Sequence, residues 1–375
     1  MSVIRSTSIL TNQPTLETLY TLPNFPIYAG CVTTNQNNDN LLDLCVDICT
    51  KTGMLQLKNL PSMEDVYLFP HNDAIGSTWE EHNELFLKFI EKFNPKKILE
   101  IGGGSGKLAT KFIERNTHSE WTIIDPNPLF AEQSKLYNIK EYFSSNIQLD
   151  RDFDTVIHSH VLEHQFDPEQ FLTDISKLLT YDEMHIFSFP NMFVWLTEKY
   201  LNCLNFEHTL FLTEKFTDVL LKKTGFEILE KFFFRRDHSI FYATRFIGKK
   251  SDSDFPNLYN ENRQLYLSFI SYYEDFVKQL NSKLKNYPFK IFIFGAHMFS
   301  QYLLAFGLEQ SKIHGILDNS NLKIGKRLYG TKLTVFHPNI IKNEKEVVVI
   351  LKVGSYRNEI VAQLKKINPN VIIYE

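Results

Sequence analysis

Cysteine is scarce in this sequence, and long apolar runs are missing. The 375 residues include only four cysteines, namely Cys31, Cys45, Cys49 and Cys203. Such a small number in a chain of this length shows no disulfide framework. No apolar run reaches the roughly 18 residues that a membrane-spanning helix needs, and the N-terminal MSVIRSTSILTNQPT lacks the apolar core of a signal peptide. We therefore expect a soluble, cytoplasmic protein with no membrane partner.

Clusters of basic residues are absent as well. The chain has 40 Lys and Arg against 44 Asp and Glu, which gives a net charge of −4. A nucleic-acid-binding protein normally shows a basic patch or stripe, so we expect no nucleic-acid partner. Hydrophobic residues make up 43% of the chain and include 32 phenylalanines, which suffices for a substantial core. The length predicts two or three domains.

The most informative stretch is KILEIGGGSGK, residues 97–107, an apolar strand that ends in a glycine cluster. Gly102, Gly104 and Gly106 follow the acidic Glu100 at alternate positions. Glycines there allow a tight turn and let backbone N–H groups approach a ligand closely. A dinucleotide fingerprint, G-x-G-x-x-G, would place the third glycine one residue later. The segment is either a plain glycine-rich loop or motif I of the class I S-adenosylmethionine (SAM) dependent methyltransferases, which its E-x-G-x-G-x-G spacing resembles.

Two later segments favour the methyltransferase interpretation. A second strand, 121–124, ends in Asp125, where a carboxylate typically accepts hydrogen bonds from a ribose. A third strand runs into V-L-E-H, and the whole segment FDTVIHSHVLEHQFDPEQFL (153–172) resembles the fourth-strand region of the same enzymes. The resemblance implies SAM as cofactor, bound by Glu100, the three alternate glycines, Asp125 and His160.

Strand and helix patterns alternate from residue 97 to residue 247, which predicts a parallel sheet covered on both faces. The last two strands, 226–234 and 239–246, read as a hairpin that closes the sheet. The pattern predicts an α/β fold, and the resemblance to the class I methyltransferases implies a seven-stranded, Rossmann-like core. A small N-terminal lobe precedes this core, and a C-terminal Rossmann-like α/β domain follows it. Substrates of such sheets bind outside the carboxyl ends of the parallel strands.

The predicted domains are an N-terminal lobe over 1–68, a methyltransferase domain over 69–250, and a helix plus Rossmann-like domain over 251–375. The polar linker GKKSDSDFPN separates the last two, and a long amphipathic helix follows it over 258–286. FGAHMFS (294–300) is similar to a dinucleotide-binding turn, but it lacks the further glycines. We therefore expect no second dinucleotide site.

The N-terminal lobe contains two short strands about a Thr-Gly turn, within residues 41–57. Cys45 and Cys49 in this segment are spaced so that they could be two ligands of a metal site. No C-x-x-C pair and no histidine partner accompany them. The prediction is therefore a protein without a bound metal.

Two loops carry candidate bases. His71 lies in a polar turn before a helix for which Ser77 or Thr78 is the expected N-cap. This loop either overhangs the SAM site or is an ordinary connection. The second loop, before a helix that Thr213 starts, carries Glu207 and His208, which we expect at the same edge of the sheet. The pair is either a solvated surface feature or a base, since imidazole accepts protons near neutral pH.

The whole chain resembles the nucleotide-sugar C-methyltransferases, which combine a zinc lobe, a SAM domain and a C-terminal Rossmann-like domain. DNSNLKIGKRLYGTKLTVF (318–336) is similar to their C-terminal D-x-x-x-x-K-x-G stretch. NFEHTLFLTEKFTDVLLKKTGFEI resembles the segment with their catalytic Tyr-x-Glu-His, in which Glu207 and His208 match and Asn205 replaces the tyrosine. CTKTGMLQL resembles their C-x-x-C-G-x-x-Q-L, with Thr52 in place of the second cysteine. The family's tyrosines before the first SAM-domain helix are absent, and His71 lies in that region.

The resemblance implies a SAM-dependent methyltransferase acting on a nucleotide-linked or phosphorylated sugar, in surface-polysaccharide or deoxysugar biosynthesis. For C-methylation, His208, oriented by Glu207, removes the proton next to a ketone, and the enolate carbon takes the methyl group. For O-methylation the same base takes a hydroxyl proton, with His71 or His160 as alternates. The rival interpretations are a non-catalytic scaffold with a SAM fold, and a methyltransferase acting on protein or nucleic acid.

Overall fold

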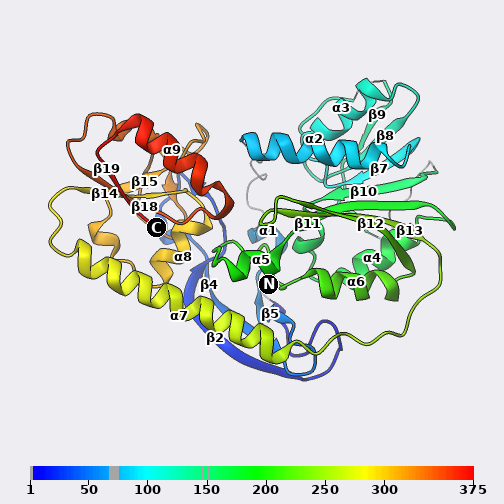
Figure 1. The fold of residues 1–375 in the computed structure, drawn as a ribbon, viewed down its shortest axis with the longest axis horizontal. Helices are drawn as coiled ribbons and strands as arrows, with labels where there is room; N and C mark the ends of the chain where they lie inside the picture. The colour runs from blue at the N-terminus through cyan, green and yellow to red at the C-terminus, as the bar shows by residue number, and fades with distance from the viewer. Residues whose placement is uncertain (1–2, 67–75, 133, 145–146, 148, 150–151) are drawn as a thin grey trace. The chain divides into compact units, whose positions relative to one another are not determined.

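The computed structural model describes residues 3–66, 76–132, 134–144, 147, 149 and 152–375 (Figure 1). The chain forms two compact units. Unit 1 comprises Met1–Leu68, Phe193–Phe211 and Asn257–Glu375, and unit 2 comprises Phe69–Met192 and Leu212–Pro256. Unit 1 thus contains both the N-terminal lobe and the C-terminal domain that the sequence predicts. It also contains Phe193–Phe211, which the sequence assigned to the methyltransferase domain. No helix among the described residues is long and apolar enough to cross a membrane.

Unit 2 is built on a seven-stranded sheet in the order β12-β13-β11-β10-β7-β8-β9. Its strands are β7 (Lys97–Ile101), β8 (Glu120–Ile124), β9 (Leu136–Ile139), β10 (Thr155–Ser159), β11 (Met184–Pro190), β12 (Phe226–Phe234) and β13 (Ser239–Phe246). The strands β7 to β11 pair in parallel, and the hairpin β12–β13 joins the sheet antiparallel to β11. This mixed sheet is the class I methyltransferase fold that the sequence predicts. No strand was predicted at the position of β9.

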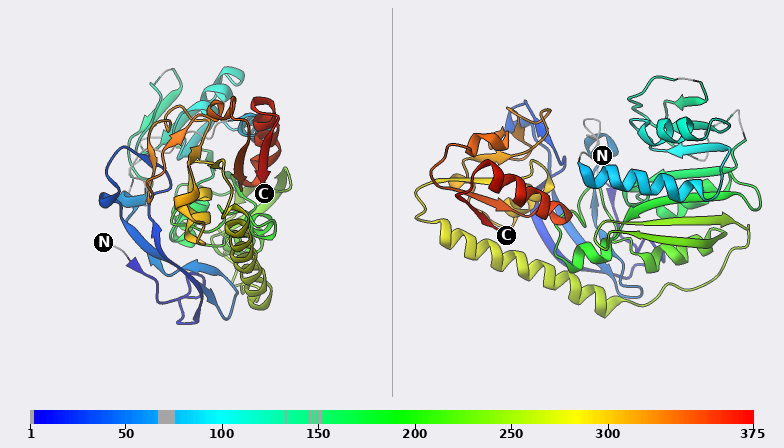
Figure 2. Two further views of the ribbon diagram at one scale, coloured as in Figure 1. Left: turned by 90° about the vertical axis from the view of Figure 1, so that its left-hand side faces the viewer. Right: turned by 45° about the horizontal axis from the view of Figure 1, so that its top comes forward.

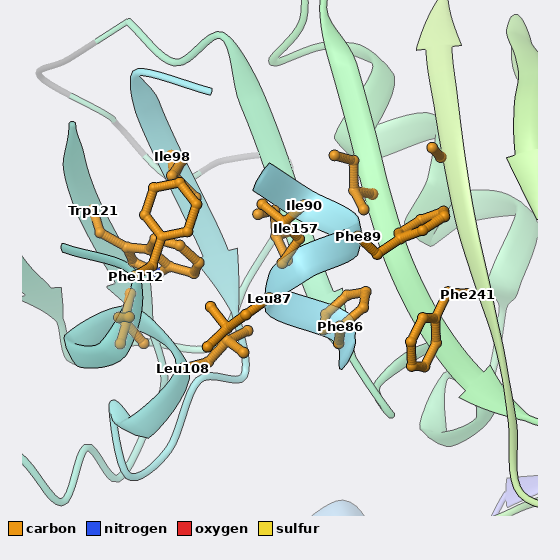
Figure 3. Packing of buried hydrophobic residues seen from close by; sticks show 14 of the residues in the cluster. Phe86, Leu87, Phe89, Ile90, Ile98, Leu108, Phe112, Trp121, Ile157 and Phe241 are labelled. Atoms are coloured by element: carbon orange, nitrogen blue, oxygen red, sulfur yellow. The ribbon is translucent and has the colours of Figure 1, made fainter. Parts of the chain in front are cut away.

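Helices cover both faces of this sheet. They are α2 (Ser77–Glu91), α3 (Lys107–Arg115), α4 (Pro168–Ser176) and α6 (Glu214–Lys223). Phe241 packs against Phe86 of α2, whereas the next residue along the strand, Tyr242, donates a hydrogen bond to Asp218 of α6. Because neighbouring strand residues point to opposite faces, α2 and α6 lie on opposite sides of the sheet. Figure 3 shows the α2 side chains packed with those of α3 and the strands.

The start of α2 differs from the prediction. Gly76 is the N-cap, with φ 128°, and its carbonyl accepts the N–H of Trp79 and of Glu80. Ser77 is already inside the helix. The Thr78 hydroxyl accepts a hydrogen bond of 2.9 Å from Arg235 instead of capping the helix. A tertiary contact has therefore replaced the local cap that the sequence favoured.

The N-terminal part of unit 1 is a small antiparallel sheet. Its strands are β2 (Leu16–Pro26), β4 (Leu41–Cys49) and β5 (Leu55–Leu57), with β1 (Val3–Ile4) paired to β6 (Asn59–Leu60) and a short helix α1 (Met63–Val66) after them. The predicted pair of strands about a Thr-Gly turn is thus confirmed as β4 and β5. Strand β3 (Cys31–Val32) pairs with β16 (Arg327–Leu328), which joins the lobe to the C-terminal part of the same unit.

The C-terminal part of unit 1 is a parallel sheet in the order β17-β15-β14-β18-β19. Its elements are α7 (Tyr259–Leu284), β14 (Lys290–Phe294), α8 (Met298–Ala305), β15 (Gly315–Leu317), β17 (Val335–Phe336), β18 (Val347–Leu351), α9 (Arg357–Ile367) and β19 (Val371–Tyr374). Figure 2 shows α9 beside this sheet. The alternation predicted for this region, including the long helix α7, is therefore present.

Candidate functional site

The glycine loop after β7 has the backbone conformation that only glycine adopts easily. Gly102, Gly104 and Gly106 have φ values of 77°, 38° and 67°. A Cβ at Gly102 would lie 2.8 Å from the Val161 side chain, and one at Gly106 would lie 2.8 Å from the Phe130 ring. At Gly104 the nearest atom would be Asp125 Oδ2, at 3.8 Å. Two of the glycines therefore permit close packing, and Gly104 faces the open side from which a cofactor can approach.

Asp125 follows β8 and is oriented by the backbone around it. Its Oδ2 accepts the Gly104 N–H at 3.0 Å, and its Oδ1 accepts the Asn127 N–H at 2.7 Å. Hydrogen bonds of this kind hold a carboxylate in one place. The acidic side chain thus lies directly beside the glycine loop, where the sequence predicts the ribose of SAM.

We expect Asp125→Ala to weaken SAM binding by about tenfold or more. The change removes charge-assisted hydrogen bonds to the ribose worth about 1.5–3 kcal/mol each. Isothermal titration calorimetry with SAM measures the effect. Asp167→Ala is the matched control, because Asp167 caps α4 of the same unit by accepting the Gln170 N–H. Equal SAM affinities of Asp125→Ala and wild type would contradict the assignment.

Glu100 lies beneath the glycine loop. Its side chain is buried, and its Oε2 accepts the indole N–H of Trp121 at 2.9 Å. A Cβ at Gly103 would come within 2.7 Å of the same oxygen, so the carboxyl group directly underlies the loop. Burial raises the pKa of Glu100 to about 7, although the Trp121 hydrogen bond opposes the shift. The geometry shows Glu100 supporting the loop, and a contact with SAM stays a prediction.

The raised pKa predicts pH-dependent stability. Between about pH 4.5 and 7 the folded protein keeps a proton on Glu100 that the unfolded chain has lost. The free energy of unfolding should therefore fall as the pH rises through this window, by up to about 3 kcal/mol. Glu100→Gln should flatten the dependence in urea titrations at several pH values. Glu141→Gln, at an exposed position, is the control, and an unchanged slope in Glu100→Gln would contradict the explanation.

His160 follows β10, at the same edge of the sheet as the glycine loop. Its backbone is left-handed, with φ 54°, an uncommon conformation for a residue other than glycine. Nδ1 lies 2.9 Å from Oε1 of the buried Glu163, and Nε2 lies 2.8 Å from Ser239 Oγ. The neighbouring Val161 is the residue that would meet a Cβ at Gly102. The ring is therefore held beside the glycine loop, as predicted, and its contact with SAM stays a prediction.

Two further histidines, which the sequence did not single out, surround His160. His82 comes from α2 and His238 from the turn before β13, and ligand nitrogens of all three lie within 4.8 Å of one another. Burial lowers the pKa of His82 well below its usual value and that of His238 to about 3, with the neighbouring His160 adding to both shifts. Trp79 contacts all three rings. No local motif connects these positions, because His82 looks like one more member of a buried helix face.

Glu207 and His208 belong to unit 1, together with the N-terminal lobe. The segment that carries them pairs with β5, since Leu57 N–H donates to Thr209 O and Phe211 N–H donates to Leu55 O, both at 2.9 Å. The sequence predicted that this segment belongs to the methyltransferase domain. These contacts instead place it in unit 1, beside β5. The position of His208 beside the cofactor stays a prediction.

Both side chains of the Glu-His pair are buried rather than solvated. His208 Nδ1 lies 2.9 Å from the Asn202 carbonyl, to which it donates, so Nε2 is the nitrogen that can take up a proton. Asn205, in the place of the family's tyrosine, accepts the N–H groups of Glu207 and His208 with its Oδ1. The asparagine therefore shapes the loop.

Tyr28 of the lobe is a phenol that the sequence did not single out. Its pKa rises to about 12, first because of burial and then because of Cys31 and Glu207 nearby. No local pattern marks this tyrosine, because strand and loop segments far apart in the sequence bring it towards Glu207. The other candidate base, His71, lies outside the described residues.

Cys45 and Cys49 of the lobe are buried beside carboxylate and hydroxyl groups. Cys45 Sγ lies 3.8 Å from Asp47 Oδ1, and Cys49 Sγ lies 3.3 Å from Thr15 Oγ1. Burial raises the pKa of Cys49, but hydrogen bonds, including those with Thr15 and Thr52, lower it to about 7. Within the described part of the chain, neither cysteine is in a group of three potential metal ligands. Thr52 thus bonds to the thiol where the related family has a second cysteine.

Two solved structures with a similar fold each cover less than half of this chain. Human N-acetylserotonin methyltransferase in complex with SAM is 16% identical, with 46% of this chain and 53% of that chain covered and a TM-score of 0.39. The N-methyltransferase NodS from Bradyrhizobium japonicum is 13% identical, with 45% of this chain and 97% of that chain covered and a TM-score of 0.35. This chain thus spans about half the length of the human enzyme. No curated protein matches the sequence.

Two family models match consecutive parts of the chain. Residues 78–231 match the methyltransferase domain, and residues 250–371 match the C-methyltransferase C-terminal domain. The first match contains the glycine loop, Asp125 and His160, and the second begins just before α7. The domain over residues 78–231 is therefore an S-adenosylmethionine-dependent methyltransferase of the class I fold, followed by a C-methyltransferase C-terminal domain.

Proposed function

We propose that the protein transfers the methyl group of SAM to a carbon atom of a nucleotide-linked or phosphorylated sugar. The observation that carries the proposal is the match of residues 250–371 to the C-methyltransferase C-terminal domain, directly after the methyltransferase domain. Surface-polysaccharide or deoxysugar biosynthesis is the setting in which such a product is used. The absence of a basic cluster in the sequence speaks against nucleic acid as the acceptor.

The chain's own residues supply binding and proton transfer in this proposal. SAM supplies a methyl group already activated by its sulfonium. The glycine loop and Asp125 hold the cofactor, and His208 Nε2 removes the proton from the sugar carbon next to a ketone. That carbon then becomes the nucleophile. Donation from His208 Nδ1 to the Asn202 carbonyl supports this role, because it fixes the tautomer with the lone pair on Nε2.

The alternative is O-methylation, and the pairing of His160 with Glu163 favours it. A carboxylate 2.9 Å from Nδ1 makes Nε2 a better proton acceptor, here for a sugar hydroxyl. This base would lie in the same unit as the glycine loop. The two proposals differ in the atom that carries the new methyl group.

A single experiment separates these activities. The protein is incubated with methyl-¹³C-SAM and a panel of nucleotide sugars with and without a 4-keto group, and products are analysed by mass spectrometry and ¹³C NMR. We expect a carbon-bound methyl group in a keto sugar. Without SAM, the same sugar in D₂O should exchange the hydrogen next to its ketone, because His208 forms the enolate first.

An oxygen-bound methyl group would instead establish O-methylation. SAM binding without methylation of any sugar in the panel, and without hydrogen exchange, would contradict the proposal and favour a non-catalytic scaffold.

A further inference from the structure

We propose that His82, His160 and His238 form a binding site for a divalent transition-metal ion, with Zn²⁺ as its occupant. All three belong to unit 2, and they come from α2, from the loop after β10 and from the turn before β13. Neutral imidazole is a preferred ligand of Zn²⁺, and three histidines form a known ligand set for it. This site lies outside the lobe in which the related family binds zinc, and it does not depend on the identity of the methyl acceptor.

The spacing of the rings agrees with a shared ion. Ring centroids are 5.4 Å apart for His82 and His160, 5.4 Å for His82 and His238, and 6.0 Å for His160 and His238. Three imidazoles that bind one tetrahedral Zn²⁺ at about 2.0–2.1 Å have centroids about 5 Å apart. Small movements of the side chains would therefore complete the coordination.

The positions of the protons favour a cation at the centre of the three rings. His82 Nδ1 lies 3.2 Å from the Asn83 amide oxygen, so it carries the proton, and the fully buried Nε2 has a lone pair with no hydrogen-bond partner among the described residues. Glu163 Oε1 lies 2.9 Å from His160 Nδ1 without hydrogen-bond geometry, and the nearby carboxylate favours the proton on Nδ1 and the lone pair on Nε2. An unpaired buried lone pair is costly, and a metal ion would satisfy it.

The third ring and Ser239 complete this arrangement. Ser239 Oγ is 2.8 Å from His160 Nε2 and 2.6 Å from His238 Nδ1. Its single proton goes to His160, so His238 Nδ1 donates to the oxygen and the His238 lone pair is on Nε2. His82 Nε2 and His238 Nε2 thus carry lone pairs for a metal, and the His160 Nε2 lone pair becomes available when the Ser239 hydroxyl rotates away from it.

The surroundings are those of a metal site. Histidine ligands usually donate their second N–H to a carboxylate or carbonyl, which orients the ring and raises its basicity. The Asn83 amide provides this partner for His82, and the Glu163 carboxylate lies 2.9 Å from His160 Nδ1 without hydrogen-bond geometry. Trp79 contacts all three rings, with centroid distances of 5.0, 4.9 and 4.9 Å, and shields them with an apolar surface. Polar neighbours therefore orient the histidine rings, and the apolar Trp79 ring packs over them.

A bound ion would connect α2 to the carboxyl edge of the sheet beside the glycine loop. It would also occupy the His160 lone pair, so that His160 could not act as the base and His208 would remain as the base. The sequence alone predicted no metal, because histidines this far apart in the chain show no ligand spacing. We therefore revise that expectation at this site.

The test is metal analysis of the full chain, produced without a histidine tag. The protein is stripped with chelator, dialysed against Zn²⁺ and analysed by inductively coupled plasma mass spectrometry. We expect about one Zn²⁺ per chain, and a rise in melting temperature of roughly 5–10 °C when free Zn²⁺ exceeds its Kd about 100-fold. His82→Gln should lose both effects.

Two variants serve as controls. His118→Gln removes an exposed histidine of the same unit, and Cys45→Ala removes a candidate ligand of the lobe. Both should keep the ion. Zn²⁺ retained in His82→Gln, or lost in Cys45→Ala but not in His82→Gln, would overturn the proposal, as would wild type that binds no Zn²⁺.

A spectroscopic measurement on the wild type keeps the proposal testable if His82→Gln does not fold. Co²⁺ in place of Zn²⁺ should give the intense visible absorption of a tetrahedral site. A sulfur-to-metal charge-transfer band would point to the lobe cysteines, and a weak octahedral spectrum would point to adventitious binding. Either result would contradict the three-histidine site.

Discussion

Gly104→Val is expected to abolish SAM binding while the protein remains folded. Gly104 has φ 38°, and a Cβ at this position would have Asp125 Oδ2 as its nearest neighbour, at 3.8 Å, so the side chain would project into open space beside the loop. That space is where the cofactor must lie to reach Asp125. A valine would fill it and would strain the left-handed backbone by about 1–3 kcal/mol. Calorimetric titration with SAM, together with a circular dichroism spectrum, measures both consequences.

Gly307→Val is the control for backbone strain. Gly307 also has a positive φ, 97°, and a Cβ there would meet no described atom within 4 Å, but it lies in the C-terminal part of the chain. This variant should be destabilised to a similar extent and should still bind SAM. If Gly104→Val binds SAM as wild type does, the glycine loop is not the cofactor site.

His208→Ala is expected to lower turnover by about 10²–10⁴-fold while SAM affinity stays nearly unchanged. A positioned general base contributes a factor of this size, and its loss acts on the chemical step. Nδ1 is held by the Asn202 carbonyl, so the ring presents Nε2 in a fixed orientation. Turnover is measured with the acceptor found in the nucleotide-sugar panel, and the exchange of substrate hydrogen in D₂O should fall in parallel.

Glu207→Gln should lower turnover by a smaller factor than His208→Ala does, because Glu207 orients the imidazole and does not transfer the proton. His314→Ala, which removes an exposed histidine of the same unit, should have no effect on turnover. Full turnover by His208→Ala would show that the Glu-His pair is not the base. His71 would then be the next base to test, followed by His160 in protein that holds no metal ion.

The sequence by itself determined the elements that depend on local pattern. Strands β12 and β13 have the predicted bounds, and the glycine loop lies between a strand and a helix as its spacing indicates. These features could be predicted because their signals are local. Strand and helix periodicities, like the need for glycine at positive φ, depend on only a few neighbouring residues. Together with the resemblance of residues 97–107 and 153–172 to the class I methyltransferases, these local signals predicted the fold.

The tertiary structure decided every feature that depends on residues far apart in the chain. It replaced the predicted cap of α2 with a contact between Thr78 and Arg235, and it joined the loop of His208 to the N-terminal lobe. It also brought His82 and His238 to His160, although no spacing in the sequence connects them. Hydrogen bonds and packing between distant segments select these arrangements, and their energies are not encoded in any short stretch of sequence.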